Sequence, residues 1–353
     1  MGNFFLKLKK DKVPFVAFCV LLALYLLILF ADFFALYPSL YSNRKLAYQP
    51  PSNIYLINQE NKIVHPYTYN YIKTFNKDTF SIEYKQDRSK KYKINLFSKG
   101  YEYKFLGLIK TNIHLISVEE GGQLHLLGTD INGCDVFSRL FFGGQISLTI
   151  GFLALLISFP IGAIYGGISG YLGGKTDKIL MRIAEGIMSI PSFYLLIILA
   201  SILPSNMNSY QRFALITSIL AFIGWAGFSR VIRGMVLSIK NQEYVKAVET
   251  IGASRARVIL KHILPQTSSY VIIAITLSVP SYILAESGLS FLGLGIQLPD
   301  ASWGNMLREA QEFANILYRP WLLTPGFLIF IAVLSFNVLG DKIRDILDPK
   351  TLK

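Results

Sequence analysis

Six long apolar runs constrain what this chain can fold into. The first covers Val13 to Tyr37, and five more follow at about 146–172, 179–203, 213–233, 267–293 and 321–340. At about 1.5 Å of rise per helical residue, each run can cross a hydrocarbon layer of roughly 30 Å. With 52% hydrophobic and 16% charged residues over 353 positions, the chain is too apolar for a soluble protein of this size. The runs predict an all-α polytopic membrane protein with six transmembrane helices.

Prolines and glycines inside the runs are compatible with this prediction. Pro160, Pro191 and Pro280 each fall inside a run, and membrane helices tolerate proline where neighbouring helices cover the freed carbonyls. Glycines such as Gly162 and Gly166 allow helices to approach closely.

The first run is interpreted as an uncleaved span. Four lysines lie between Phe4 and Lys12, and the apolar run begins directly after them. A secretory signal peptide has the same order, but its apolar region is only about 7–15 residues long and a small-x-small cleavage site follows. The run of about 25 residues has no such site after it. Residues 1–37 are therefore expected to form a cytoplasmic tail and the first transmembrane helix.

Residues 38–124 have a different composition. Half of the 20 tyrosines lie between Tyr41 and Tyr103, together with many lysines and asparagines. The segments FSIEY (80–84) and YKINL (92–96) alternate apolar and polar residues, and QDRSK between them is interpreted as a turn. The pattern predicts a β-containing extracytoplasmic insert after the first span. A nucleic-acid surface is the competing interpretation, but the preceding span should export this segment.

A basic stretch between two apolar runs, residues 234–266, is too polar for hydrocarbon. Tyr244, Val248 and Ile251 fall at helical spacing and predict one apolar stripe of a short helix. Gly252 follows where the helix should end, since glycine adopts the left-handed conformation at little cost. Ser254 can cap a second short helix, which Pro265 prevents from continuing smoothly.

That second helix carries Val258, Ile259 and Ile263 on one face. The whole stretch predicts a helix, a glycine joint and a helix presented between two spans, as a docking surface would be. Attachment of a basic loop to anionic headgroups is the alternative.

The distribution of lysine and arginine predicts the orientation. With the N-terminus inside, the cytoplasmic segments hold eighteen of the 35 basic residues, whereas the short outer loops hold Arg212, Arg308 and Arg319. The other fourteen lie in the insert and the segment after it, where the rule is weak because long domains cross regardless of charge. Both termini and the 234–266 loop are therefore expected in the cytoplasm.

The loop resembles the EAA loop of permease subunits of binding-protein-dependent ABC importers. The resemblance lies in Ala247, in Gly252 five residues on, and in Leu264-Pro265. Lys246 and Val248 replace the family's usual glutamate and second alanine. The resemblance implies that the loop seats in a cleft of the ATP-binding subunit, through eight candidate residues: Tyr244, Lys246, Ala247, Glu249, Gly252, Ala253, Leu264 and Pro265.

Residues 125–148 contain a second motif. By pattern alone, Val136, Phe137, Leu140 and Phe141 make the apolar face of a short interfacial helix. The segment also resembles the GTD-x-x-G-R-D-x-x-SR element of the dipeptide/oligopeptide/nickel permease family. Cys134 stands where that family usually has arginine. The matching residues are Gly128, Thr129, Asp130, Gly133, Asp135, Ser138 and Arg139.

The end of the chain extends the resemblance. Residues 287–307 and 320–350 look like the C-type subunit of dipeptide and oligopeptide importers, with Gly340-Asp341, Arg344-Asp345 and Asp348-Pro349 as closing residues. The resemblance implies a permease core over 125–353 with five transmembrane helices and the cytoplasmic coupling loop 234–266.

No catalytic or metal-binding pattern is visible. The four histidines lack metal-ligand spacing, and no Walker A loop, nucleophile elbow or pair of catalytic carboxylates occurs. Glu185, Glu286 and Asp341 lie in or at the ends of apolar runs and are expected to pack helices or line a mouth. The chain is predicted not to be an enzyme, and to bind no metal and no cofactor itself.

The resemblance implies a prokaryotic plasma (inner) membrane protein that forms half of a translocation pathway. Its implied partners are a second permease subunit, two cytoplasmic ABC ATPases that hydrolyse the ATP, an external substrate-binding protein and membrane lipid. Peptides are the expected cargo, with nickel or modified peptides as alternatives. An ion-gradient-driven secondary transporter and a membrane sensor or anchor are alternatives from other classes, and nucleic acid is not an expected partner.

Overall fold

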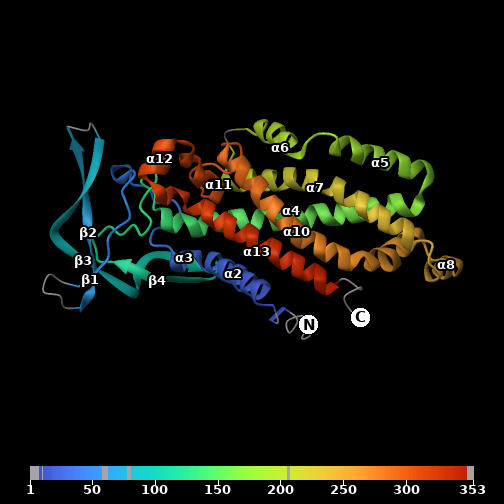
Figure 1. The fold of residues 1–353 in the computed structure, drawn as a ribbon, viewed down its shortest axis with the longest axis horizontal. Helices are drawn as coiled ribbons and strands as arrows, with labels where there is room; N and C mark the ends of the chain where they lie inside the picture. The colour runs from blue at the N-terminus through green and yellow to red at the C-terminus, as the bar shows by residue number, and fades with distance from the viewer. Residues whose placement is uncertain (1–7, 10, 58–62, 78–80, 205–206, 348–353) are drawn as a thin grey trace. The chain divides into compact units, whose positions relative to one another are not determined.

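The computed structural model describes residues 8–9, 11–57, 63–77, 81–204 and 207–347 (Figure 1). The chain forms two compact units. One comprises Met1–Leu21, Leu148–Leu289 and Phe330–Lys353, and the other comprises Leu22–Ser147 and Ser290–Ile329. The boundaries fall within long helices, so each unit contains segments of the apolar runs.

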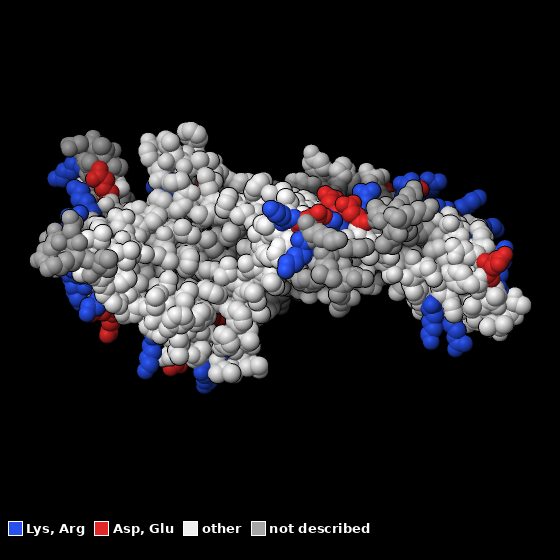
Figure 2. Space-filling model, turned by 60° about the horizontal axis from the view of Figure 1, so that its bottom comes forward, with Lys and Arg blue, Asp and Glu red and all other residues white. Residues whose placement is uncertain are grey.

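Long apolar helices dominate the part of the chain that the structure describes. Five helical stretches are long and apolar enough to cross a membrane, and a sixth crossing exists if one bent pair of helices is a single span. The long helices are α2 Lys12–Leu29, α4 Val136–Leu172, α7 Ser209–Ile239, α10 Ser268–Phe291 and α13 Thr324–Leu347. Figure 2 shows wide areas of the visible surface without charged residues, as lipid-facing helices require. The chain is thus a mostly helical multi-pass membrane protein.

The run expected at 179–203 is divided into two helices. These are α5 Gly174–Met188 and α6 Ser192–Ser201, and the chain bends by 77° between them. Pro191 precedes α6 with φ −55° and ψ 124°, outside the helical region. Because proline lacks an N–H and disfavours a helical residue before it, the hydrogen-bond ladder stops here. Pro160 and Pro280, in contrast, lie inside continuous helices.

The short interfacial helix predicted at Val136–Phe141 is not separate, and that prediction is wrong. These residues form the first turns of α4, which continues for 37 residues to Leu172. At about 1.5 Å per residue the helix is roughly 55 Å long, so it extends well beyond a hydrocarbon layer of about 30 Å. Val136 and Leu140 are buried and Phe137 and Phe141 are half-buried, so this apolar face packs against the protein.

Helices α4 and α7 pack backbone to backbone in the first unit. A Cβ atom on Gly162 would lie 2.8 Å from the carbonyl oxygen of Trp225, and one on Gly170 would lie 2.8 Å from that of Arg233. Only glycine permits this approach. Asp177 of α5 accepts two 2.5 Å hydrogen bonds from the Arg233 guanidinium, which joins α5 to α7. The predicted use of small residues for close helix packing is confirmed here.

The insert in the second unit is an antiparallel four-stranded sheet of order β1-β2-β3-β4. Its strands are β1 Tyr55–Ile57, β2 Ile63–Asn76, β3 Ser81–Phe105 and β4 Ile109–Val118. The chain enters and leaves the insert side by side: the Ser52 amide donates to the His125 carbonyl at 2.8 Å, and the His125 amide donates to the Ser52 hydroxyl at 2.9 Å. The predicted β-containing insert is confirmed.

The turn predicted at QDRSK is wrong. These residues lie in the first half of β3, which is 25 residues long and pairs with β2 over its first half and with β4 over its second half. Asp87 lies opposite Asn70 and Tyr92 opposite Thr68, with a register irregularity between the two pairs. QDRSK contains neither Gly nor Pro to reverse the chain, and an exposed strand tolerates polar residues.

Short segments complete the two units. The second unit contains α3 Ala31–Phe34, η1 Arg44–Leu46, α11 Trp303–Met306, η4 Leu307–Gln311, α12 Phe313–Tyr318 and η5 Pro320–Leu323. The first contains α8 Glu243–Thr250, α9 Arg255–Arg257, the π-helical η2 Val258–Ile263 and the 3-10 helical η3 Leu264–Thr267.

Candidate functional site

The glycine joint after α8 has a complete helix-ending geometry. Gly252 adopts φ +84°, and its amide donates to the Glu249 carbonyl at 3.0 Å. The next amide, of Ala253, donates to the Val248 carbonyl at 3.3 Å. These two bonds are the 5→2 and 6→1 pair of a Schellman motif. No atom lies within 4 Å of the position that a Cβ of Gly252 would take, so conformation alone demands glycine here.

The buried stripe of α8 differs from the predicted one. Val245 is fully buried, Val248 is half-buried and Tyr244 is exposed. Ile251 is 83% exposed because it lies beyond the last helical residue, where the Schellman turn redirects the chain. Tyr244 instead reaches across the joint, and its hydroxyl donates to the His262 carbonyl at 3.2 Å.

The segment after the joint is helical but irregular. Val258, Ile259 and Ile263 are buried, as their spacing predicts. Ser254 occupies the cap position of α9 without a side-chain capping bond. The π-helical turns of η2 pass into the 3-10 helix η3, which contains Pro265, and then into α10. The expected interruption by proline is therefore present as a change of helix type.

The exposed surface of the predicted coupling segment (Glu243–Thr267) is mainly basic. Its exposed cations are Lys246, Arg255, Arg257 and Lys261. Lys246, Glu249 and Arg255 line a depression of about 380 Å³. Among the remaining predicted coupling residues, Ala247 and Pro265 are exposed, whereas Ala253 and Leu264 are half-buried. The structure thus brings the predicted residues together around one joint.

In the second unit, Asp135 anchors the start of α4. One of its carboxylate oxygens accepts from the Ser138 amide at 2.8 Å and from the Ser138 hydroxyl at 2.6 Å, which caps the helix. The other lies 2.8 Å from Nδ1 of His125. The Ser138 hydroxyl also accepts from the amides of Leu36 and Tyr37, at 3.0 and 3.1 Å. Ser138 therefore joins the segment after the first span to the start of α4.

Gly128 and Thr129 fix the loop before that helix. Gly128 has φ +67°, and a Cβ on it would lie 2.6 Å from the Gln49 carbonyl oxygen. The Thr129 hydroxyl donates to the Leu46 carbonyl at 2.5 Å and accepts from the Gln49 amide at 2.8 Å. Gly133 has φ +69° and also lies against this loop, beside the carbonyl of Asn43. The motif residues thus hold the ends of the insert against α4.

Asp130 and Arg139 form a buried ion pair between Arg139 Nε and an Asp130 carboxylate oxygen, 3.8 Å apart. Asp130 also accepts from the amides of Asn132 and Cys134, at 2.8 and 2.9 Å. The Arg139 guanidinium donates to the carbonyls of Pro299 and Asp300, each at 3.3 Å. Burial raises the pKa of the Cys134 thiol to about 11, so this departure from the family pattern is an inert side chain.

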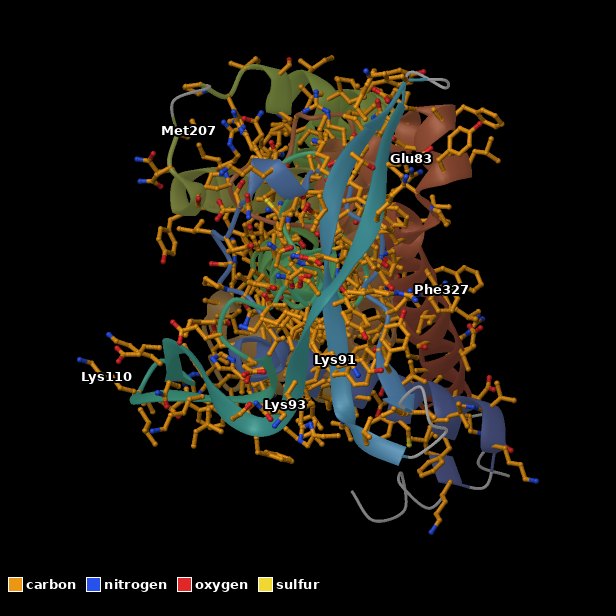
Figure 3. All side chains as sticks on the ribbon, turned by 90° about the vertical axis from the view of Figure 1, so that its left-hand side faces the viewer. Glu83, Lys91, Lys93, Lys110, Met207 and Phe327 are labelled. Atoms are coloured by element: carbon orange, nitrogen blue, oxygen red, sulfur yellow. The ribbon has the colours of Figure 1, made fainter. Side chains whose placement is uncertain are left out.

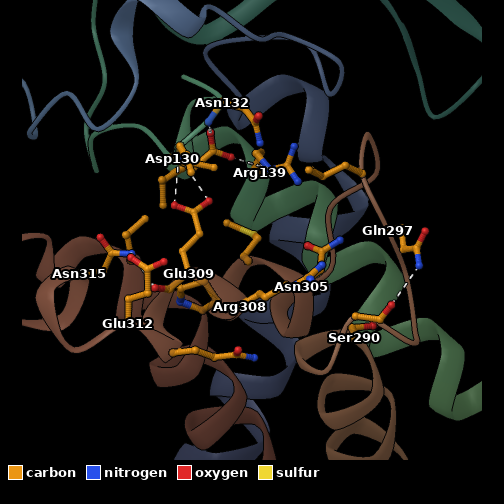
Figure 4. Close-up of a pocket in the computed structure, with 18 of the residues that line it drawn as sticks. Asp130, Asn132, Arg139, Ser290, Gln297, Asn305, Arg308, Glu309, Glu312 and Asn315 are labelled. Carbon is orange, nitrogen blue, oxygen red and sulfur yellow. Dashed lines mark hydrogen bonds and ion pairs between the residues drawn. The ribbon is translucent and has the colours of Figure 1, made fainter. Parts of the chain in front are cut away.

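A polar cavity of about 670 Å³ adjoins this ion pair (Figure 4). Glu309 reaches across it and accepts from the Ile131 amide at 3.1 Å. Burial, followed by the negative charge of Asp130, raises the pKa of Glu309 to about 7. Arg308, Asn305 and Gln297 also line the cavity. The site can change its charge near neutral pH.

Glu309 was not predicted as a site residue. It lies in the 3-10 helix η4, outside the apolar runs, and its sequence neighbours give no signal of burial. Its raised pKa comes from burial and from the charge of Asp130, 179 positions away in the chain. Of the acids singled out from the sequence, Glu286 is fully buried, Asp341 is exposed, and Glu185 lies 3.9 Å from Arg182. Among the described residues, no group of three or more His, Cys, Asp or Glu is placed to hold a metal ion.

Comparison with known proteins places these features in a family. Residues 158–353 match the model of the binding-protein-dependent transport system inner membrane component, and residues 1–51 match the N-terminal TM domain of oligopeptide transport permease C. The matches leave 52–157, which includes the whole sheet, outside them.

Named relatives agree with these matches. The chain is 46% identical over 228 residues to the dipeptide transport system permease protein DppC of Bacillus subtilis, covering 64% of this chain and 69% of the relative. It is 42% identical over 230 residues to the oligopeptide transport system permease protein OppC of the same organism, covering 65% and 73%. A solved amino acid ABC transporter has a TM-score of 0.43 at 17% identity, covering 59% of this chain and 94% of its own. On the family match and the relatives, this chain belongs to the binding-protein-dependent transport system inner membrane components.

Proposed function

We propose that the chain forms one half of the translocation pathway of an ATP-driven importer of peptides in the plasma (inner) membrane of a prokaryote. This proposal rests on the Schellman joint at Gly252, which ends α8 in a fixed direction. Val245 holds α8 by its burial, and Ile251 at the joint is exposed to a partner. The names of the dipeptide and oligopeptide relatives support peptides as the cargo class.

The proposed topology has six spans, with α5 and α6 together forming the third. Both termini and the coupling loop 234–266 lie in the cytoplasm, and the insert 38–124 lies outside. The basic residues exposed on the coupling segment support this orientation, since cytoplasmic loops are enriched in lysine and arginine. The domains are then 1–37, 38–124 and the permease core 125–353.

The proposed partners are a second permease subunit, two cytoplasmic ABC ATPases and an external substrate-binding protein. The chain itself binds no cofactor, and the ATPase subunits hydrolyse the ATP. The Schellman motif fixes the end of α8. This supports an ATPase contact, because a helix that docks on another subunit must keep its orientation when that subunit moves. The exposed Lys246, Arg255 and Arg257 favour an acidic cleft on that ATPase.

Coupling follows from how α8 is tied to the spans. Lys240, the residue after α7, donates through Nζ to the Gly170 carbonyl at 2.8 Å, so it holds the end of α4. A displacement of α8 by the ATPases is therefore passed to α4 and α7 together, which changes access to the pathway.

The test is reconstitution of the chain with its proposed partners in proteoliposomes, followed by uptake of a labelled dipeptide and a labelled oligopeptide. ATP-dependent uptake that an ionophore leaves unchanged supports the proposal. Uptake that follows an imposed ion gradient without ATP identifies a secondary transporter instead. Nickel or a modified peptide that displaces the labelled peptide with higher affinity would correct the cargo class while retaining the importer.

A further inference from the structure

The turn between β3 and β4 exposes large apolar side chains. Leu108 is 85% exposed, Ile109 is 66% exposed and Leu106 is 51% exposed. Phe97, further back on β3, is 68% exposed. A cluster of this kind marks a surface that contacts a partner or a membrane.

The same hairpin is fixed to the end of the first membrane helix. Phe105 stacks on Phe30 with ring centroids 5.3 Å apart, and Phe97 lies 6.3 Å from Phe33. Phe30 directly follows α2, whose 18 residues extend about 27 Å and cross most of the hydrocarbon layer. Phe105 is therefore held at the level where the acyl chains end.

The exposed cluster continues a surface that already faces lipid. Leu22, Leu26 and Leu29 on α2 are 48%, 45% and 55% exposed, as expected for the lipid side of a span. Phe30 follows Leu29, and the turn follows Phe105. Lipid that covers Leu29 thus meets the turn without an intervening polar segment.

Charge on the hairpin also fits a membrane surface. Lys104 lies directly opposite Lys110 in the β3–β4 register, while Phe105 and Ile109 form the next pair on the other face. Like charges opposite each other in an antiparallel pair repel. Anionic headgroups relieve that repulsion, because lysines beside a bilayer bind acidic lipid while apolar neighbours enter the interface.

We propose that the β3–β4 turn, Lys104–Lys110, is a membrane anchor seated in the headgroup layer around the first span. Leu106, Leu108 and Ile109 enter the boundary with the acyl chains, and the two lysines contact anionic headgroups. The anchor fixes the height of the insert above the bilayer. It is independent of the cargo and of ATP coupling, and requires only that α2 crosses the membrane.

The opposite end of the sheet supplies a matched control. Ile82 at the start of β3 is 56% exposed, so it is an exposed aliphatic side chain like Leu108. It lies in the other hairpin, and Figure 3 shows Glu83 and Lys110 at opposite ends of the sheet. Tyr84 near Ile82 donates its hydroxyl to the Ala47 carbonyl at 2.7 Å, so this hairpin is held against the 44–49 loop rather than against α3.

The test uses the assembled transporter in lipid nanodiscs, in a Cys19→Ala background that retains the buried Cys134. Nitroxide labels at Leu108→Cys and Ile82→Cys are compared by their collision rates with oxygen, which concentrates in lipid, and with a water-soluble nickel chelate. Both sites are exposed, so neither label should disturb folding, and uptake should stay near wild type.

The proposal expects an oxygen-to-nickel collision ratio several times higher at position 108 than at position 82. It also expects the ratio at 108 to fall when Lys104 and Lys110 are both changed to Gln in nanodiscs that contain anionic lipid. An aqueous signature at 108 equal to that at 82 would overturn the anchor. Protection of 108 from both reagents would also overturn it, and would identify a protein subunit as the cover.

Discussion

The hydroxyl of Tyr171, in the last turn of α4, donates a 2.6 Å hydrogen bond to Oε1 of Glu249 in α8. Glu249 also supplies the carbonyl that the Gly252 amide contacts. One residue of α8 is therefore bonded through its side chain to a span and through its backbone to the glycine joint. If α8 transmits the movement of an ATPase, this bond connects it directly to α4.

Changing Tyr171 to Phe should lower coupling more than stability. The bond is exposed, so its loss should cost about 0.5–1 kcal/mol, which leaves membrane insertion unchanged. Uptake per ATP hydrolysed should fall, because α8 loses its side-chain bond to α4 and is left with the link through Lys240 and Gly170. The measurement is the ratio of peptide uptake to phosphate release in proteoliposomes. Tyr210→Phe, at an 88% exposed tyrosine of α7, is the control and should retain the wild-type ratio.

Gly252→Val should be inserted normally and transport poorly. The left-handed φ of +84° should cost a branched residue roughly 1–2 kcal/mol locally, with no added clash because the space around a Cβ is open. The redirected chain should remove contacts with the ATPase. Gly252→Asn, which tolerates the left-handed region, should recover much of the uptake. Both variants are compared by uptake and ATPase co-purification; normal uptake by the valine variant would exclude the joint as the coupling element.

Lys246→Glu should have a mild effect. The side chain is exposed, and the new carboxylate would lie three residues from Glu249 on the same helix, a repulsion of about 0.2–0.5 kcal/mol. Uptake should remain well above that of Gly252→Val. A loss as severe as that of the valine variant would instead indicate that Lys246 meets an acid on the ATPase, and a charge reversal on that acid should restore uptake.

Glu309 should make stability fall as pH rises. Its folded-state pKa of about 7 lies above the usual value near 4.5, so the folded chain holds a proton that the unfolded chain releases. The contribution is fully present below about pH 4.5 and is lost as pH rises through about 7, on the order of 2–3 kcal/mol. Thermal unfolding at pH 5.5 and 8 should show this difference. Glu309→Gln should flatten it, whereas Glu120→Gln, at an exposed site, should leave it unchanged.

Thiol labelling tests the orientation. In the Cys19→Ala background, a cysteine at the exposed Lys85 of β3 should react with a membrane-impermeant maleimide from outside. A cysteine at the exposed Ser254 should react only after permeabilisation. Reaction at Ser254 in intact cells would place the coupling segment on the wrong side for any ATPase.

Composition and periodicity were sufficient to predict the helices, because hydrocarbon demands long apolar runs wherever the chain crosses it. They also predicted the joint at Gly252, since a helix end and a left-handed residue are local events. Pro191 is a limit of this reasoning: its ring breaks the third run, yet Pro160 and Pro280 leave theirs intact. Neighbouring helices decide between these outcomes, and they are not visible in a single run.

Long-range relations were the other limit. The raised pKa of Glu309 depends on burial and on the charge of Asp130. The path of β3 through QDRSK depends on its partner strands. The polar residues of QDRSK suggest a turn locally, but the chain stays in β3 because it pairs with β2 on both sides of the register irregularity, at Asp87 with Asn70 and at Tyr92 with Thr68. Similarly, His125 shows no metal-ligand spacing, and only the fold reveals that it is bonded to Asp135 beneath the ring of Tyr37, 4.9 Å away.

Two hydrogen bonds between Ser52 and His125, one between backbone groups and one accepted by the Ser52 hydroxyl, bring the two ends of the sheet segment together. Because the chain leaves and returns at adjacent points, the segment between them can lengthen, shorten or be exchanged while its two attachment residues keep their places. A reporter or a binding domain can therefore be grafted at this junction.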